Sequence, residues 1–249
     1  MTIIKQNSKK EDEIFSIINA KVAFGDTVLF DNLNLSLFKN NITCLLGSSG
    51  VGKTSLLRLI AGLIPQDQAT KTSGIKGRIA FMGQQDFLLP WLSIMNNVLL
   101  GARLRKESPE TEKAMKLIQR LGLLPHLNKS TAQLSTGMRQ RIALARTIME
   151  NQPLVLMDEP FASLDAVNRY KMQNISVELL AKSTVLMVTH DPLEALRIGN
   201  QILIMHGDPV KLTQLNTEEL GTLPRDLTDN HVIRYQKELL ELLSMGNKI

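Results

Sequence analysis

Cysteine and long apolar runs are the two features that this 249-residue sequence most clearly lacks. Its single cysteine, Cys44, lies in an apolar stretch, so no disulfide can form within the chain and a buried thiol is expected. No apolar run approaches the length of a membrane-spanning helix, and no charged, apolar and small-residue signal peptide opens the chain. We therefore expect a protein that is made and kept in a reducing cytosol.

A strong excess of either charge sign is also missing, because 29 Lys and Arg residues against 24 Asp and Glu residues give a net charge of +5. A mildly basic protein could bind nucleic acid, an anionic membrane surface or a phosphate ligand. A solvated surface with a slight lysine excess accounts for the same balance, and we expect no nucleic-acid partner. We find no internal repeat and no low-complexity tract, and the length allows one large domain or two small ones.

A complete phosphate-loop motif, G-x-x-x-x-G-K-T, occupies residues 47–54. A strand-like apolar stretch precedes it and a helical pattern closed by Gly62 follows it, which is the context that the motif requires. Lys53 can reach the β- and γ-phosphates of a nucleotide, and the Thr54 hydroxyl is a suitable ligand for Mg²⁺. Glycine-rich turns also join strands to helices without binding anything, but here every fixed position is filled. The predicted nucleotide-binding residues of this stretch are Gly47, Ser48, Ser49, Gly50, Val51, Gly52, Lys53, Thr54 and Ser55.

Two consecutive acids, Asp158 and Glu159, follow a short apolar run. A carboxylate at the carboxyl end of a strand is what a site for Mg²⁺ and a nucleotide needs, so Asp158 is a predicted metal ligand, directly or through water. Glu159 can accept the proton of an attacking water molecule. The alternative, that the two acids only cap a strand, loses weight beside the phosphate loop.

Strand and helix patterns follow a definite order along the chain. Residues 1–13 are polar and predict a flexible tail, and residues 14–37 predict antiparallel strands with a turn at Gly25 and Asp26. Strands predicted at 42–46, 77–82, 154–157, 185–188 and 202–205 alternate with helices, which indicates an α/β fold with a mostly parallel sheet covered on both faces.

A helical insertion at about 86–149 interrupts this α/β core. One of its helices is predicted to be capped by Ser108, to open at Pro109 and to end at Gly122, and another starts near Gly137. We assign residues 14–206 to one domain and residues 207–249 to a C-terminal helical extension. The apolar face of that extension carries Val232, Tyr235, Leu239 and Leu242.

The run L-S-T-G-M-R-Q-R at residues 134–141 resembles the L-S-G-G-Q signature of ATP-binding-cassette (ABC) ATPases, in a form common among bacterial importers. Residues 158–165 resemble the acid pair and D-loop of that family, and residues 188–191 resemble its switch-histidine motif. Gln84 resembles the lid glutamine, with Gln85 as an alternative, and Phe24 resembles the aromatic that stacks on adenine, although it could be a core residue. The resemblance covers residues 14–206 and implies a P-loop NTPase fold with an antiparallel β subdomain and an inserted helical subdomain.

The resemblance further implies a homodimer that binds and hydrolyses ATP with Mg²⁺. Each ATP would lie between one phosphate loop and the partner's signature, so that Ser135, Gly137 and Asp165 would act on the other chain's nucleotide. The catalytic residues would be Glu159, His190, Gln84 and Lys53, and the metal ligands would be Thr54, Gln84 and Asp158. A lone histidine at a strand end is often only structural, but the place of His190 after a buried strand favours a contact to the γ-phosphate and the attacking water.

The sequence departs from the family pattern at three places. Thr136 replaces the first signature glycine, where a β-branched residue would resist a positive φ and add bulk, so we expect the substitution to be tolerated but to slow closure. Ala162 and Ser163 reverse the usual D-loop order, and Asn40 and Asn41 stand where Gly-Glu is common before the phosphate-loop strand.

A single cassette without a membrane span implies transport through separate permease subunits, with this chain at the cytoplasmic face of the inner membrane. Residues 88–93 (L-L-P-W-L-S) resemble the segment that receives the permease in importers of the nitrate, sulfonate and taurine type, although Pro90 and Trp91 could instead pack a hinge. Residues 188–197 resemble a subgroup associated with uptake of thiamine-pyrimidine precursors, in which a substrate-binding protein takes part indirectly. The alternatives are the ATPase of an exporter or lipoprotein-release complex, and a soluble non-transport ABC ATPase.

Overall fold

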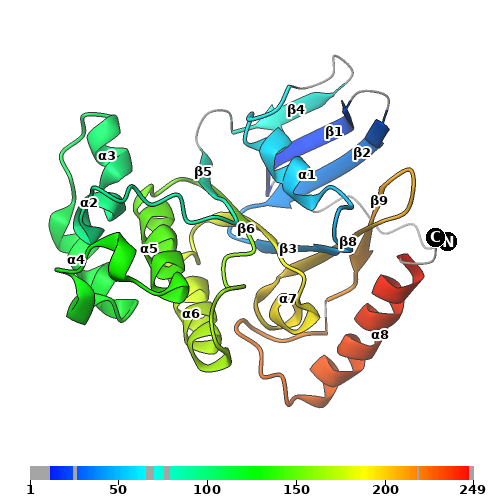
Figure 1. The fold of residues 1–249 in the computed structure, drawn as a ribbon. Coiled ribbons are helices and arrows are strands. Elements are labelled where there is room, and N and C mark those ends of the chain that lie inside the picture. Colours follow the sequence, from blue (N-terminus) through cyan, green and yellow to red (C-terminus); the bar gives the residue numbers. More distant parts are fainter. Residues whose placement is uncertain (1–11, 25–26, 66–69, 76–78, 218, 247–249) are drawn as a thin grey trace.

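The computed structural model describes residues 12–24, 27–65, 70–75, 79–217 and 219–246. Its central element is a six-stranded sheet with the order β5-β6-β7-β3-β8-β9 (Figure 1). Its strands are β3 (Ile42–Gly47), β5 (Ile79–Met82), β6 (Leu154–Asp158), β7 (Thr184–Val188), β8 (Gln201–His206) and β9 (Lys211–Leu215). The strands from β5 to β8 are parallel and β9 is antiparallel to β8, so the predicted mostly parallel sheet is confirmed.

Successive side chains of the central strands enter two hydrophobic cores, one on each face of the sheet. In β3, Cys44 and Leu46 pack into one core and Leu45 packs into the other. The core around Leu45 contains helix α1 and the antiparallel strands, and the other contains α6, α7 and α8. The bounds of these helices are α1 (Lys53–Ile60), α6 (Ala166–Leu179), α7 (Pro192–Ile198) and α8 (Asn230–Gly246). The Cys44 thiol is buried, as predicted, and burial raises its pKa.

A second, three-stranded antiparallel sheet has the order β2-β1-β4. Strands β1 (Glu13–Phe24) and β2 (Thr27–Phe38) confirm the predicted antiparallel pair, and β4 (Lys71–Gly74) was not predicted. The predicted turn at residues 25–26 and residues 1–11 of the predicted tail lie outside the described residues. Glu13, the last residue assigned to that tail, already belongs to β1.

The predicted helical insertion contains four helices and two short 3-10 turns, at 124–126 and 131–133, and stands beside the β5 edge of the sheet (Figure 1). The helices are α2 (Ile94–Val98), α3 (Leu100–Leu104), α4 (Thr111–Arg120) and α5 (Thr136–Met149). The end of α4 at Gly122, with φ 68°, is confirmed, but its predicted start at Ser108 and Pro109 is wrong. The Pro109 carbonyl accepts a hydrogen bond from Thr111 N at 2.9 Å, so Pro109 lies in a tight turn and Glu110 is the N-cap.

The segment after Gly207 was predicted to be a helical extension, but it begins with strand β9, which pairs with β8. The mixed Lys, Thr and Gln content of β9 hides its strand pattern, and only Leu215 in it is fully buried. Helix α8 confirms the predicted last helix, with Val232, Tyr235 and Leu239 buried. In the described part of the chain, no helix combines the length and apolar character needed to span a membrane.

Candidate nucleotide site

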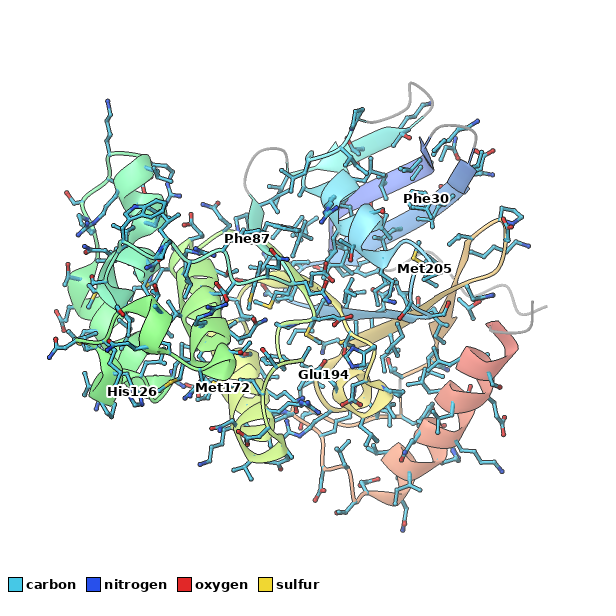
Figure 2. All side chains as sticks on the ribbon, in the orientation of Figure 1. Phe30, Phe87, His126, Met172, Glu194 and Met205 are labelled. Atoms are coloured by element: carbon cyan, nitrogen blue, oxygen red, sulfur yellow. The ribbon has the colours of Figure 1, made fainter. Side chains whose placement is uncertain are left out.

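The phosphate loop joins β3 to α1 at the carboxyl edge of the central sheet. Gly52 is the N-cap of α1 and has a φ of 105°, a left-handed conformation that favours glycine. A Cβ atom at Gly47 would lie 2.5 Å from the backbone oxygen of Met205, a residue of β8 labelled in Figure 2, so the neighbouring strand leaves no room for a side chain. These two glycines let the loop end at the first turn of α1, where unpaired backbone N–H groups can receive an anion.

Lys53 extends across the loop rather than into solvent, and the residue is only 8% exposed. Its Nζ atom donates hydrogen bonds to the carbonyl oxygens of Gly47 and Ser48, both at 2.8 Å. Burial lowers the pKa of Lys53, and the nearby carboxylates of Glu159 and Asp158 act against this effect. A buried cation beside an anion-binding loop is suited to bind phosphate oxygens.

Thr54 and Asp158 meet next to this lysine. The Thr54 hydroxyl donates a hydrogen bond to Asp158 Oδ2 at 2.8 Å, which joins the first turn of α1 to the end of β6. Asp158 is buried, and this burial raises its pKa while the Thr54 hydrogen bond lowers it. A hydroxyl and a carboxylate are the hard oxygen ligands that Mg²⁺ prefers. The described residues contain no group of three or more His, Cys, Asp or Glu side chains that could hold a metal ion, so an Mg²⁺ ion here would need further ligands such as Gln84, a nucleotide or water.

Three of the predicted catalytic residues, Glu159, His190 and Gln84, lie together. The Glu159 Oε2 atom lies 3.4 Å from His190 Nδ1 and accepts a hydrogen bond from Gln84 Nε2 at 3.4 Å. The Glu159 backbone is left-handed, with φ 50°, and its N–H donates to the carbonyl oxygen of Val188 at 2.9 Å. The position of Gln84 at this carboxylate favours it over Gln85 as the lid glutamine.

Two arginines of α5 hold the loop that follows Gln84, a contact that the sequence analysis missed. Arg139 Nε donates to the Asp86 carboxylate at 2.9 Å. Arg146 Nη2 donates to the Asp86 carbonyl at 2.6 Å, and its Nη1 donates to the Phe87 carbonyl at 2.9 Å. The loop is therefore attached to the same helix that begins with the signature. The only sequence signal was that the two arginines are spaced two helical turns apart, which places them on one face.

The signature forms the start of α5. Ser135 is the N-cap, and its Oγ accepts a hydrogen bond from Met138 N at 3.3 Å. Thr136 is the first helical residue and is not among the residues with positive φ, so the expected backbone strain at this position is wrong. Threonine fits because the helical backbone has negative φ, and its side chain is exposed. A Cβ atom at Gly137 would lie 3.2 Å from Leu164 Cδ2, so the signature packs closely on its own D-loop.

Asp165 and Phe24 are the two remaining predicted contacts to the nucleotide. Asp165 is the N-cap of α6, where its Oδ1 accepts a hydrogen bond from Asn168 N at 3.0 Å, and hydrogen bonds from Asn168 lower its pKa. Phe24 ends β1, but its side chain lies outside the described residues. Within the described residues we find no hydrogen bond or ion pair between residues 135–137 and the phosphate loop of the same chain.

The comparisons with known proteins agree with this geometry. The family described as ABC transporter matches residues 30–162. The chain belongs to the ABC transporter family. The ATP-binding proteins of this family hydrolyse ATP to drive transport, so the predicted ABC ATPase fold and the predicted ATPase activity are confirmed.

Similar proteins cover nearly the whole chain. An uncharacterized ABC transporter ATP-binding protein of Haemophilus influenzae is 44% identical over 91% of this chain and 97% of its own length. The aliphatic sulfonates import ATP-binding protein SsuB 2 of Pseudomonas syringae pv. tomato is 36% identical over 93% of this chain and 98% of its own length. The formylaminopyrimidine import ATP-binding protein ThiZ of Halalkalibacterium halodurans is 38% identical over 73% of this chain and 75% of its own length.

A solved structure of an ABC transporter in an inward-facing conformation contains a chain of the same fold. It superposes with a TM-score of 0.71 at 28% sequence identity, over 84% of this chain and 87% of that chain.

Proposed function

We propose that this ABC ATPase powers the uptake of a small solute through separate membrane permease subunits. Relatives with import in their names, for aliphatic sulfonates and for formylaminopyrimidine, align with most of the chain and support an importer. The main support for a role in ATP hydrolysis is the position of the Glu159 carboxylate, which contacts both Gln84 and His190 beside the phosphate loop. We propose that the transported solute is a small molecule of the kind that these relatives import, such as a sulfonate or a pyrimidine precursor.

Each residue of the site has a role that follows from its geometry. Lys53 would exchange its carbonyl partners in the loop for phosphate oxygens of ATP. Glu159 would accept the proton of the attacking water, and His190 and Gln84, both at its Oε2, would hold that water and the γ-phosphate in line. Thr54 and Asp158 would hold Mg²⁺, which would neutralise phosphate charge when bound.

We propose that the second half of each site comes from another copy of the chain. Ser135 and Gly137 lie at the start of α5, where a helix N-terminus favours phosphate, and within the described residues they make no hydrogen bond or ion pair with their own phosphate loop. A partner copy placed head to tail would bring this helix end, with Asp165, to the γ-phosphate. Phe24 would stack on the adenine.

We propose that residues 88–93 and their surroundings bind the permease. The Trp91 side chain is 75% exposed and the Phe87 side chain is 63% exposed, and both lie where the helical insertion leaves β5. Exposed large aromatic side chains are typical of protein interfaces, and these two lie four residues apart in the sequence. A permease bound here would contact the loop that carries Gln84, and the ATPase would then sit on the cytoplasmic face of the membrane, with a substrate-binding protein acting on the other side.

The test is co-purification of the chain with the permease of the same gene cluster, followed by reconstitution in vesicles. We expect ATP hydrolysis that rises when a binding protein loaded with a sulfonate or a pyrimidine precursor is added, together with solute uptake. Lys53→Ala serves as the control without activity. Export of a solute, or hydrolysis that no permease alters, would overturn the importer and leave one of the alternative ABC functions.

A further inference from the structure

The turn that carries His190 is bound to a buried carboxylate, Glu194, which is labelled in Figure 2. The Thr189 hydroxyl donates a hydrogen bond to Glu194 Oε2, and both residues are buried. The Thr189 oxygen in turn accepts a hydrogen bond from Asp191 N at 3.1 Å. The residues on both sides of His190 are therefore fixed to one carboxylate on the first turns of α7.

The same turn is also attached to α6, the helix that follows the D-loop. Gln173 Nε2 donates to the other oxygen of Glu194, Oε1, at 3.1 Å. Arg169, one helical turn earlier, lies 3.6 Å from Asp191 Oδ2 and donates from Nη2 to the Leu164 carbonyl at 3.0 Å. Helix α6 thus contacts the end of the His190 turn directly, through Arg169 and Asp191, and is linked to its start through Glu194, which Thr189 binds.

A third contact makes this joint between α6 and α7 stiff. Arg197 on α7 is 2% exposed, and its Nη2 donates to Asn174 Oδ1 at 2.6 Å. Its guanidinium carbon lies 3.7 Å from the centre of the Tyr170 ring, a cation–π contact. Because helices α6 and α7 share these polar contacts, a displacement of one helix must displace the other or break buried hydrogen bonds.

We propose that Thr189 and Glu194 are positioning residues that set the place of His190 according to the position of α6. A buried carboxylate costs free energy unless it is fully hydrogen-bonded, and a role in packing alone would be met better by an apolar side chain. Here both carboxylate oxygens accept hydrogen bonds, one from the turn and one from α6. Because α6 begins at Asp165 of the D-loop, an event at the D-loop reaches His190 along this route.

This inference rests on the proposed role of His190 in hydrolysis. The decisive variant is Thr189→Val, which removes the hydroxyl but keeps a β-branched side chain in the buried strand end. We expect kcat to fall about 10-fold or more, because small displacements of a group in the site have effects of this size, while KM for ATP changes less than about twofold. Thr189→Ser, which keeps the hydroxyl, should restore most of kcat. Glu178→Ala removes an exposed carboxylate from α6 and is the control, for which we expect an unchanged kcat.

A second readout does not depend on hydrolysis. The chain has four histidines, so the side-chain NMR signals of His190 can be assigned by mutation. We expect the His190 signals to move in Thr189→Val while those of His126, His206 and His231 stay in place. If Thr189→Val does not fold, Gln173→Met removes the donor on α6 and should shift the same signals.

The outcomes separate this inference from the proposed function. Normal kcat and unmoved His190 signals in Thr189→Val would overturn the positioning role although the wild type hydrolyses ATP. An equal loss in Thr189→Ser and Thr189→Val would also overturn it, since the hydroxyl would not matter. Absence of hydrolysis in the wild type would instead contradict the proposed function, and movement of the His190 signals would still support the structural link.

Discussion

Glu159 and His190 face each other across the carboxyl ends of two adjacent parallel strands, with Oε2 and Nδ1 3.4 Å apart. The contact arises from the pairing of β6 with β7, in which Asp158 lies opposite Val188. Glu159 directly follows β6, and His190 lies two residues past the end of β7, in the turn that Thr189 and Glu194 hold, so the pairing of the two strands brings the side chains close together. Catalytic groups held in this way lose little freedom when the substrate binds.

Replacing Glu159 by Gln should lower ATP hydrolysis by about 100-fold or more, because an amide cannot accept the proton of the attacking water. The amide keeps the size of the side chain, so ATP binding should be retained. Phosphate release in single-turnover experiments and calorimetric titration with ATP measure the two effects. Glu178→Gln, an exposed substitution on α6, is the control. Wild-type turnover in Glu159→Gln would assign the base to another residue.

Replacing Asp158 by Asn should stabilise the nucleotide-free protein by about 0.5–2 kcal/mol, the usual range for a single stabilising substitution, because it removes a buried charge. Burial raises the pKa of Asp158 above its ordinary value of 3.8, so the folded chain holds this proton more tightly than the unfolded chain. The contribution of the protonated Asp158 carboxyl to the free energy of unfolding is complete below pH 3.8. It is lost as the pH rises through the raised pKa.

Urea denaturation of both proteins between pH 3.5 and pH 8 tests this expectation. The advantage of Asp158→Asn should be greatest above the raised pKa of Asp158 and should shrink as the pH falls through that pKa toward 3.8. The same variant should lose Mg²⁺-dependent hydrolysis. An Asn variant that is less stable than the wild type at pH 7 would show that the Thr54 hydrogen bond outweighs the cost of burial.

Much of this site could be predicted from the sequence because its residues follow strong local patterns. The phosphate loop and the acid pair come directly after apolar runs, and His190 comes one residue later after a third run. Strand ends of a parallel sheet meet at one edge. The contacts of Arg139 and Arg146 with the loop after β5 could not be predicted, because they join segments far apart and depend on how the helical insertion packs. Strand β9 was missed because its stability comes from pairing with β8 rather than from its own residues.

The error at Thr136 has a different cause. The family signature that residues 134–141 resemble has a glycine at this position, and glycine suggested a positive φ. The structure places the residue in the first turn of a regular helix, where glycine has no conformational advantage. A family glycine can reflect lack of space for a partner molecule as well as backbone conformation.

Replacing Trp91 by Ala should impair binding of the permease while the subunit itself remains stable. The side chain is 75% exposed, so its loss should change the free energy of unfolding by less than about 0.5 kcal/mol. Co-purification with the permease measures binding, and thermal unfolding measures stability. Leu104→Ala is the control, since that side chain is 74% exposed on the same insertion. A clear drop in stability together with normal permease binding would show that Trp91 packs the hinge of the insertion instead of binding the permease.

Replacing Arg225 by Met should destabilise the fold by about 2–3 kcal/mol, because buried carbonyl groups lose their donor. Arg225 Nη1 donates hydrogen bonds to the carbonyl oxygens of Leu196 and Gly199, at 2.6 and 2.8 Å. The C-terminal segment thus supplies the donor for carbonyl groups at the end of α7. Chemical denaturation measures the effect. Arg234→Met is the control, since that arginine pairs with Glu219 on the surface. Equal stability of the two variants would show that the C-terminal segment is not bound to the core through Arg225.

The molar mass of Glu159→Gln in the presence of Mg²⁺ and ATP tests the central claim, that two copies of the chain share each ATP. Light scattering should give the 27.8 kDa monomer without nucleotide and with ADP, and twice that mass with Mg²⁺ and ATP. Ser135→Arg in the same background, which blocks the signature of the partner, should abolish the increase. A mass of 27.8 kDa at saturating ATP would contradict the shared site.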